Sequence, residues 1–167
     1  MDIGFLRNHP LTFGLKAEQL KQLGGVLEPV ELAPGDQILG EGIPAKGLFI
    51  FREGKLEVTQ KSGGQKRRLA ELEAPTVVGE VELASGGPSA ATVTAVTTAS
   101  GALLSADAFA RLVDAGDPAV AKLLRNVARV LAQRLVATNK RLTTFVAPAR
   151  QAEAVAAAGQ VGHTWTP

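Results

Sequence analysis

The sequence predicts a mainly β domain, a jelly roll with flanking helices, followed by a long C-terminal dimerisation helix. Between residues 30 and 104, short apolar runs alternate with turn signals rich in glycine and proline. Short strands with turn signals every 8–12 residues or so are typical of β-sandwiches and barrels. After residue 118, apolar residues recur at helical spacing over about three heptads, which indicates a long helix.

The jelly roll is assigned to residues 29–106, and a helical segment to residues 1–28. Leucines recur at roughly helical spacing between Leu6 and Leu27, with two glycines near the end of this stretch. The main turn signals of the roll are Pro34-Gly35-Asp36, Gly42-Ile43-Pro44, Glu53-Gly54, Ser62-Gly63-Gly64 and Gly86-Gly87-Pro88. Glycine and proline favour turns because they supply backbone angles that other residues adopt with difficulty.

Residues 107–147 are expected to form C-terminal helices. Asp117-Pro118 offers an N-cap followed by a proline in the first turn, where its missing N–H costs nothing. The helix that follows carries a heptad seam with alternating spacings of four and three residues: Leu124, Ala128, Leu131, Leu135, Thr138, Leu142 and Phe145. Pro148 is expected to end this helix, and residues 148–167 to form a flexible tail with a helical stub.

The seam predicts a homodimer through this C-terminal helix. A helix of about 28 residues is about 42 Å long at about 1.5 Å per residue, more than one small domain covers. We therefore expect a parallel coiled coil with a second copy. The alternative is a helix that packs along its own barrel.

The charge of the chain is nearly balanced, at +2 from 18 basic and 16 acidic residues. The densest basic cluster, Lys66-Arg67-Arg68, is expected to be a solvated hairpin end. Only about 20 residues follow Pro148, too few for a DNA-binding module, so direct DNA binding is not expected. The chain has no cysteine, no secretory start and no apolar run of about 18 residues, which favours a cytoplasmic protein away from membranes.

The sequence does not predict an enzyme or a metal site. Its two histidines, His9 and His163, lie at opposite ends of the chain, and no histidine–carboxylate cluster has metal-ligand spacing. No nucleophile elbow or phosphate-binding Gly-Lys-Ser/Thr loop is present. Glu80 and Glu82 are two residues apart, but nothing nearby supplies a nucleophile.

One stretch, residues 78–93, predicts a ligand pocket. It consists of a strand end, Gly79-Glu80, one helical turn, a Gly-Gly-Pro loop and a strand start made of small residues. The N-terminus of a short helix exposes free backbone N–H groups, which favour an anion. Gly79 lets the backbone approach the ligand, and the small side chains at 89–91 leave room for it.

Residues 78–93 resemble the phosphate-binding cassette of cyclic-nucleotide-binding domains, as in catabolite-activator-type regulators and protein-kinase-A regulatory subunits. The resemblance extends over roughly residues 6–145, and it implies the double-stranded β-helix (jelly roll) of that family. It implies that Glu80 binds the ribose 2′-hydroxyl of cAMP or cGMP, and that backbone groups hold the cyclic phosphate. The implied ligand-binding residues are Gly79, Glu80, Val81, Ser89, Ala90 and Ala91.

The cassette departs from the family pattern at the residue that neutralises the phosphate. The family's arginine falls at Ser89, and Glu82 adds a negative charge where a small residue is usual. Losing a charged hydrogen bond costs about 1.5–3 kcal/mol, or roughly 10- to 150-fold in affinity. Three interpretations stay open: weak binding of cAMP or cGMP, binding of a less charged ligand, and a structural remnant in a protein-interaction module.

The functional prediction is a non-catalytic regulatory or sensor module. Its cAMP or cGMP binding is expected to be weakened or lost, and it is expected to act through the dimer helix and a partner protein. Two alternatives remain, a genuine cAMP- or cGMP-binding signalling protein and a ligand-free structural adaptor or scaffold.

Overall fold

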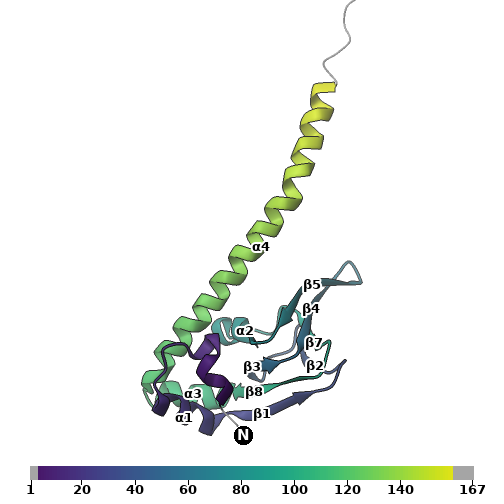
Figure 1. Cartoon of the computed structure of the whole chain (residues 1–167). Coiled ribbons are helices and arrows are strands. Elements are labelled where there is room, and N and C mark those ends of the chain that lie inside the picture. Colours follow the sequence, from purple (N-terminus) through teal and green to yellow (C-terminus); the bar gives the residue numbers. More distant parts are fainter. Residues whose placement is uncertain (1–3, 160–167) are drawn as a thin grey trace, which may run out of the picture. The chain divides into compact units, whose positions relative to one another are not determined.

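The structure is a computed structural model that describes residues 4–159, with side chains described for residues 4–142. The chain divides into two units, Met1–Arg129 and Val130–Pro167. Figure 1 labels the helices and strands along the chain. Its elements are the 3₁₀ helices η1 (Gly4–Asn8) and η2 (Pro10–Thr12), α1 (Ala17–Val26), β1 (Glu28–Leu32), β2 (Gln37–Leu39), β3 (Gly47–Glu53), β4 (Lys55–Ser62), β5 (Gln65–Glu73), β6 (Thr76–Val78), α2 (Glu80–Ser85), β7 (Thr92–Ala95), β8 (Ala99–Ser105), α3 (Ala106–Asp114) and α4 (Pro118–Gly159).

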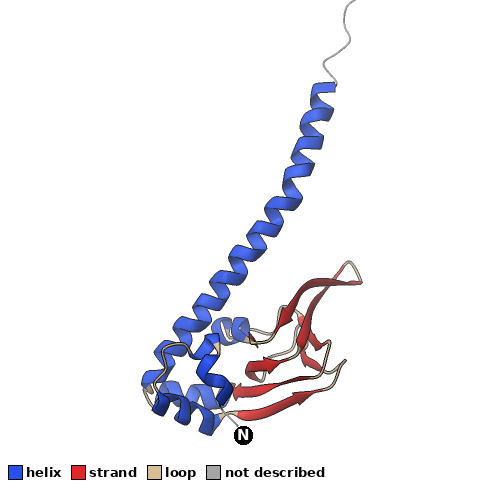
Figure 2. Cartoon of the chain, in the orientation of Figure 1, coloured by secondary structure: helices blue, strands red, loops and turns tan. Residues whose placement is uncertain are grey.

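The strands form two antiparallel four-stranded sheets, in the orders β1-β8-β3-β6 and β2-β7-β4-β5 (Figure 2). Side chains from both sheets meet in one apolar core, because alternate residues of each strand face inward. The buried members of this core are Leu39, Phe49, Phe51, Leu56, Val78, Val93, Ala95, Ala99 and Leu103. This arrangement confirms the predicted jelly roll with flanking helices.

The N-terminal segment is anchored on the first turns of α4 by polar contacts, two of them made by the buried side chain of Asn126. The side-chain amide of Asn126 donates to the carbonyl oxygens of Leu11 at 2.7 Å and Phe13 at 2.9 Å. The ammonium of Lys122 donates to the carbonyl oxygen of Gly14 at 2.8 Å. These bonds satisfy carbonyl groups of a segment that contains little regular structure.

α4 begins as predicted but ends later. The Oδ1 of Asp117 accepts a hydrogen bond from the Ala119 N–H at 2.8 Å, as expected of an N-cap. The helix then passes through Pro148 and continues to Gly159, so the expectation that Pro148 ends it is wrong. A proline in a helix removes one backbone hydrogen bond, but the alanine-rich stretch around it has the highest helix propensity and offsets that loss.

Two parts of the predicted C-terminal region are outside this description. Phe145 of the heptad seam belongs to the stretch whose side chains are not described. Residues 160–167, the end of the predicted flexible tail, lie outside the described residues altogether.

Candidate functional site: the cassette

The first half of the predicted site lies at the junction of β6 and α2. Gly79 adopts a left-handed backbone conformation with φ of 92° and is the N-cap of α2. A Cβ at this position would lie 2.3 Å from the carbonyl oxygen of Gly47 in β3. Only glycine therefore fits here, for two independent reasons: its backbone angle and the close approach to β3.

Glu80, the first residue of α2, is buried at 2 % exposure, whereas the neighbouring Val81 is 44 % exposed. Glutamate is almost never buried this fully unless it is paired. Glu82, two residues further along the same helix, is half-buried. The structure therefore sets Glu80 apart from the other acidic residue of α2 by its burial.

The second half of the site lies in the turn before β7, where Ser89 is buried at 3 % exposure. Its hydroxyl donates to the carbonyl oxygen of Ala91 at 2.9 Å. Its backbone is tied to the turn at residues 42–43, because its N–H donates to the Ile43 carbonyl at 2.9 Å and its carbonyl accepts from the Gly42 N–H at 2.7 Å. The Ser89 hydroxyl thus serves the backbone of its own turn.

The two alanines that follow are small and differently exposed. Ala90 is exposed and Ala91 is half-buried. The carbonyl of Ala90 accepts a hydrogen bond from the side-chain amide of Gln60 in β4 at 3.1 Å. The predicted site residues are therefore braced on two parts of the roll, Gly79–Val81 against β3 and Ser89–Ala91 against the 42–43 turn and β4.

Gln60 is a residue of this site to which the sequence analysis assigned no role. It lies 30 positions from Ala90 in the chain, and its contact with the cassette depends on the pairing of β4 with β7. In the sequence, Gln60 is recognisable only as a polar residue near the end of a strand whose earlier residues alternate between polar and apolar.

Within residues 4–142, no group of three or more histidine, cysteine, aspartate or glutamate side chains could hold a metal ion. Among the helices of the described part of the chain, none is long and apolar enough to cross a membrane.

The jelly roll with its Gly-Glu turn, short helix and small-residue strand start has the architecture of a family of regulatory domains. The sequence model of the family described as "Cyclic nucleotide-binding domain" matches residues 29–115, more than half of the 167 residues. The chain belongs to this family.

Two curated relatives place this domain in larger proteins. The chain is 34 % identical over 137 residues to "Glutaminase 1" of Bradyrhizobium diazoefficiens, covering 82 % of this chain and 22 % of that protein. It is 33 % identical over 110 residues to a cAMP-dependent protein kinase regulatory subunit of Yarrowia lipolytica, covering 66 % of this chain and 29 % of that protein. The chain thus spans less than a third of the length of these relatives.

Two solved structures share both the fold and appreciable identity. The N-terminal domain of a transcriptional regulator from Streptomyces coelicolor has 32 % identity and a TM-score of 0.66, with 80 % of this chain and 94 % of that chain covered. The regulatory subunit of a cAMP-independent protein kinase A from Trypanosoma brucei has 28 % identity and a TM-score of 0.65, with 79 % and 45 % covered. A triple variant of that subunit, in which one change is threonine to arginine, was solved with cAMP bound in the A site.

Proposed function

We propose that this chain is a non-catalytic regulatory module whose site binds cAMP or cGMP weakly or no longer binds it, and which acts through a helix-mediated homodimer and a partner protein. The observation that carries the proposal is the state of Ser89. This residue stands where the family resemblance implies the phosphate-binding arginine, and its hydroxyl already donates to Ala91. The site therefore lacks the cation that would neutralise a cyclic phosphate.

The missing charge decides between weak and tight binding. A guanidinium–phosphate pair is charge-assisted and often bidentate, and its loss costs about 1.5–3 kcal/mol. The buried Glu80 and the half-buried Glu82 both stand near the N-terminus of α2, and neither compensates for a lost cation. The trypanosome subunit supports this argument by analogy, since its cAMP-bound form carries an added arginine.

The test is calorimetric titration of the whole chain with cAMP and with cGMP, in the wild type and in Ser89→Arg. We expect binding in the wild type to be in the high-micromolar range or weaker, and Ser89→Arg to tighten it at least about tenfold. Thr98→Arg adds the same charge on an exposed loop residue and should leave affinity unchanged. Glu80→Gln in the Ser89→Arg background should weaken binding again, since Glu80 is the implied ribose ligand.

The same titration separates the two alternatives. A wild-type dissociation constant of about 10 μM or tighter would contradict the proposal and would indicate a genuine cyclic-nucleotide signalling protein. Absence of binding in Ser89→Arg, with an unchanged melting temperature, would indicate a ligand-free adaptor.

The dimer is proposed from the exposure of the heptad seam. Leu124, Leu135 and Leu142 are 44 %, 61 % and 57 % exposed in the single chain. Leucines at alternating spacings of four and three are the residues that a second helix covers in a coiled coil. A partner protein is proposed because a regulatory module needs a chain to regulate, as the name of the kinase subunit among its relatives indicates for that protein.

A further inference from the structure

A recess of about 640 Å³ opens beside the β4–β5 hairpin and the turn at residues 40–43. It lies on the outer face of the β2-β7-β4-β5 sheet. Val93 packs into the core, so the adjacent Thr92, which lines the recess, faces the opposite side. The residues that line it include none of Gly79–Val81 or Ser89–Ala91, so its lining differs from that of the cassette, although Gln60 borders both.

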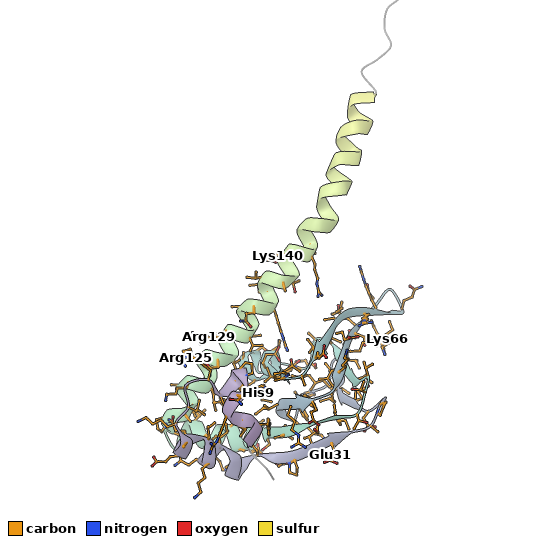
Figure 3. The ribbon with its side chains drawn as sticks, viewed as in Figure 1. His9, Glu31, Lys66, Arg125, Arg129 and Lys140 are labelled. Carbon is orange, nitrogen blue, oxygen red and sulfur yellow. The ribbon has the colours of Figure 1, made fainter. Side chains whose placement is uncertain are left out.

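A β-bulge places two lysines at this recess. The register of β4 with β5 shifts between Val58 and Thr59, and beyond the shift Lys61 lies directly opposite Lys66. An extra residue in β5 reverses which of its side chains face outward. Lys66, which is labelled in Figure 3, therefore shares the outer face with Lys61 and Thr59, and all three line the recess.

The two lysines face two carboxylates, that of Glu41, which lines the same recess, and that of Glu57 beside Lys66. Like charges directly opposite each other in a sheet are destabilising. The Lys66 ammonium lies 3.9 Å from a carboxylate oxygen of Glu57, which also pairs with Arg68, and such exposed pairs contribute little. Within the described residues, Lys61 has no ion pair. The two ammonium groups outnumber the one carboxylate that lines the recess, which favours an anionic ligand.

Polar side chains make up part of the remaining lining, beside Gly40, Gly42 and Ile43. Thr59, buried at 3 % exposure, lies opposite Thr92 in the β4–β7 register, and the carboxamides of Gln37 and Gln60 line the same recess. Its rim is held in place, because the carboxylate of Glu41 accepts from the Lys61 backbone N–H at 2.9 Å. The backbone N–H of Glu41 donates to the Thr92 hydroxyl at 3.2 Å. A fixed polar wall next to two cations suits a phosphorylated polyol better than a bare anion.

We propose that this recess binds a small phosphate monoester with a hydroxylated body, of the sugar-phosphate class. The phosphate lies between Lys61 and Lys66, and the hydroxyl groups lie along Thr59, Thr92 and Gln37. A phosphate monoester carries close to two negative charges at pH 7, unlike the singly charged cyclic diester that the cassette would take. This site goes beyond the proposed function and does not depend on it.

The probe is ribose 5-phosphate, titrated into the whole chain and followed by backbone amide NMR shifts. We expect saturable shifts at residues 40–43, 59–61, 66 and 92, with millimolar or tighter affinity. The double variant Lys61→Gln/Lys66→Gln should weaken binding at least about tenfold, whereas Lys21→Gln, an exposed lysine of α1, should leave it unchanged. Matched melting temperatures show that the double variant is folded.

Three outcomes would overturn this assignment. Inorganic phosphate binding as well as ribose 5-phosphate would remove the role of the polyol contacts. Ribose binding as well as its phosphate, or equal affinity in the double variant, would remove the role of the lysines. Shifts confined to residues 79–81 and 89–91 would place the ligand in the cassette, and Ser89→Arg would then change its affinity.

Discussion

His9 is the residue whose protonation the fold most clearly opposes. Its ring is 3 % exposed, and burial lowers its pKa below the usual 6.5, opposed by hydrogen bonds to backbone carbonyls such as that of Thr76. Its Nδ1 accepts from the Leu11 N–H at 3.1 Å, so the ring proton is on Nε2, which donates to the Thr76 carbonyl at 3.3 Å. Protonating Nδ1 would break the bond that caps η2 (Figure 3).

A pH dependence of stability follows. Because the folded-state pKa lies below that of the unfolded chain, the unfolded state takes up the proton first as pH falls. His9 therefore costs no stability above about pH 7 and destabilises the fold progressively below pH 6.5. We expect the melting temperature to fall less between pH 7 and pH 5 in His9→Asn than in the wild type. Equal slopes in the two proteins would contradict this account.

Residue chemistry also explains how far the candidate site could be read from sequence. The sequence predicts Gly79 as a point where the backbone approaches a ligand, and that role stays a prediction. The structure gives a different reason for glycine here, namely its φ of 92° and its close approach to Gly47. The use of the Ser89 hydroxyl by Ala91 was not predictable, because a serine can bond backbone, water or ligand. Only the folded turn decides among these partners.

At the scale of elements, the attachment of η2 to α4 depends on Asn126. This side chain is 1 % exposed, and its Oδ1 has no hydrogen-bond partner among the described residues. Its amide nitrogen nevertheless holds two carbonyls, of Leu11 and Phe13. The two bonds made by the amide nitrogen offset the cost of burying the unpaired oxygen.

Asn126→Ala should lower the free energy of unfolding by about 2–4 kcal/mol, since it removes two buried hydrogen bonds and their packing. The matched control is Arg129→Ala on the same helix, whose guanidinium lies 5.7 Å from the Phe13 ring centre. That exposed cation–π contact contributes only about 0.5–1 kcal/mol. Urea denaturation measures both, and equal losses in the two variants would show that Asn126 has no special role.

Elements were predictable where local chemistry sets their ends. The turn at Gly63-Gly64, which follows Ser62, separates β4 from β5, and Gly86 caps α2 with φ of 68°. Pro148 does not end α4, because the helix propensity of the alanines around it counts as well as that of the proline. The position where a helix ends depends on the summed helix propensities of several residues. The position of a tight turn depends on one or two residues.

At the scale of the whole molecule, the contacts that join distant segments were beyond reach of the sequence pattern. The recess depends on a bulge between Val58 and Thr59, and a shift of one residue reverses which side chains face outward. The bond from Gln60 to Ala90 requires β4 and β7 to be neighbours in one sheet. Periodicity predicts which strands exist, but not which strands pair.

Dimerisation is the property of the whole molecule that the seam predicts. Leu135→Glu/Leu142→Glu places charges at two of its exposed positions and should convert a dimer to a monomer in sedimentation experiments. The control, Val136→Glu, changes a residue that is 53 % exposed and off the seam, so it should remain dimeric. The melting temperature of the wild type should also rise with protein concentration, because association stabilises the folded chain by mass action, and that of the double variant should not. A wild-type monomer at about 100 μM would exclude a physiological coiled coil, since seams of this length are expected to associate well below that concentration.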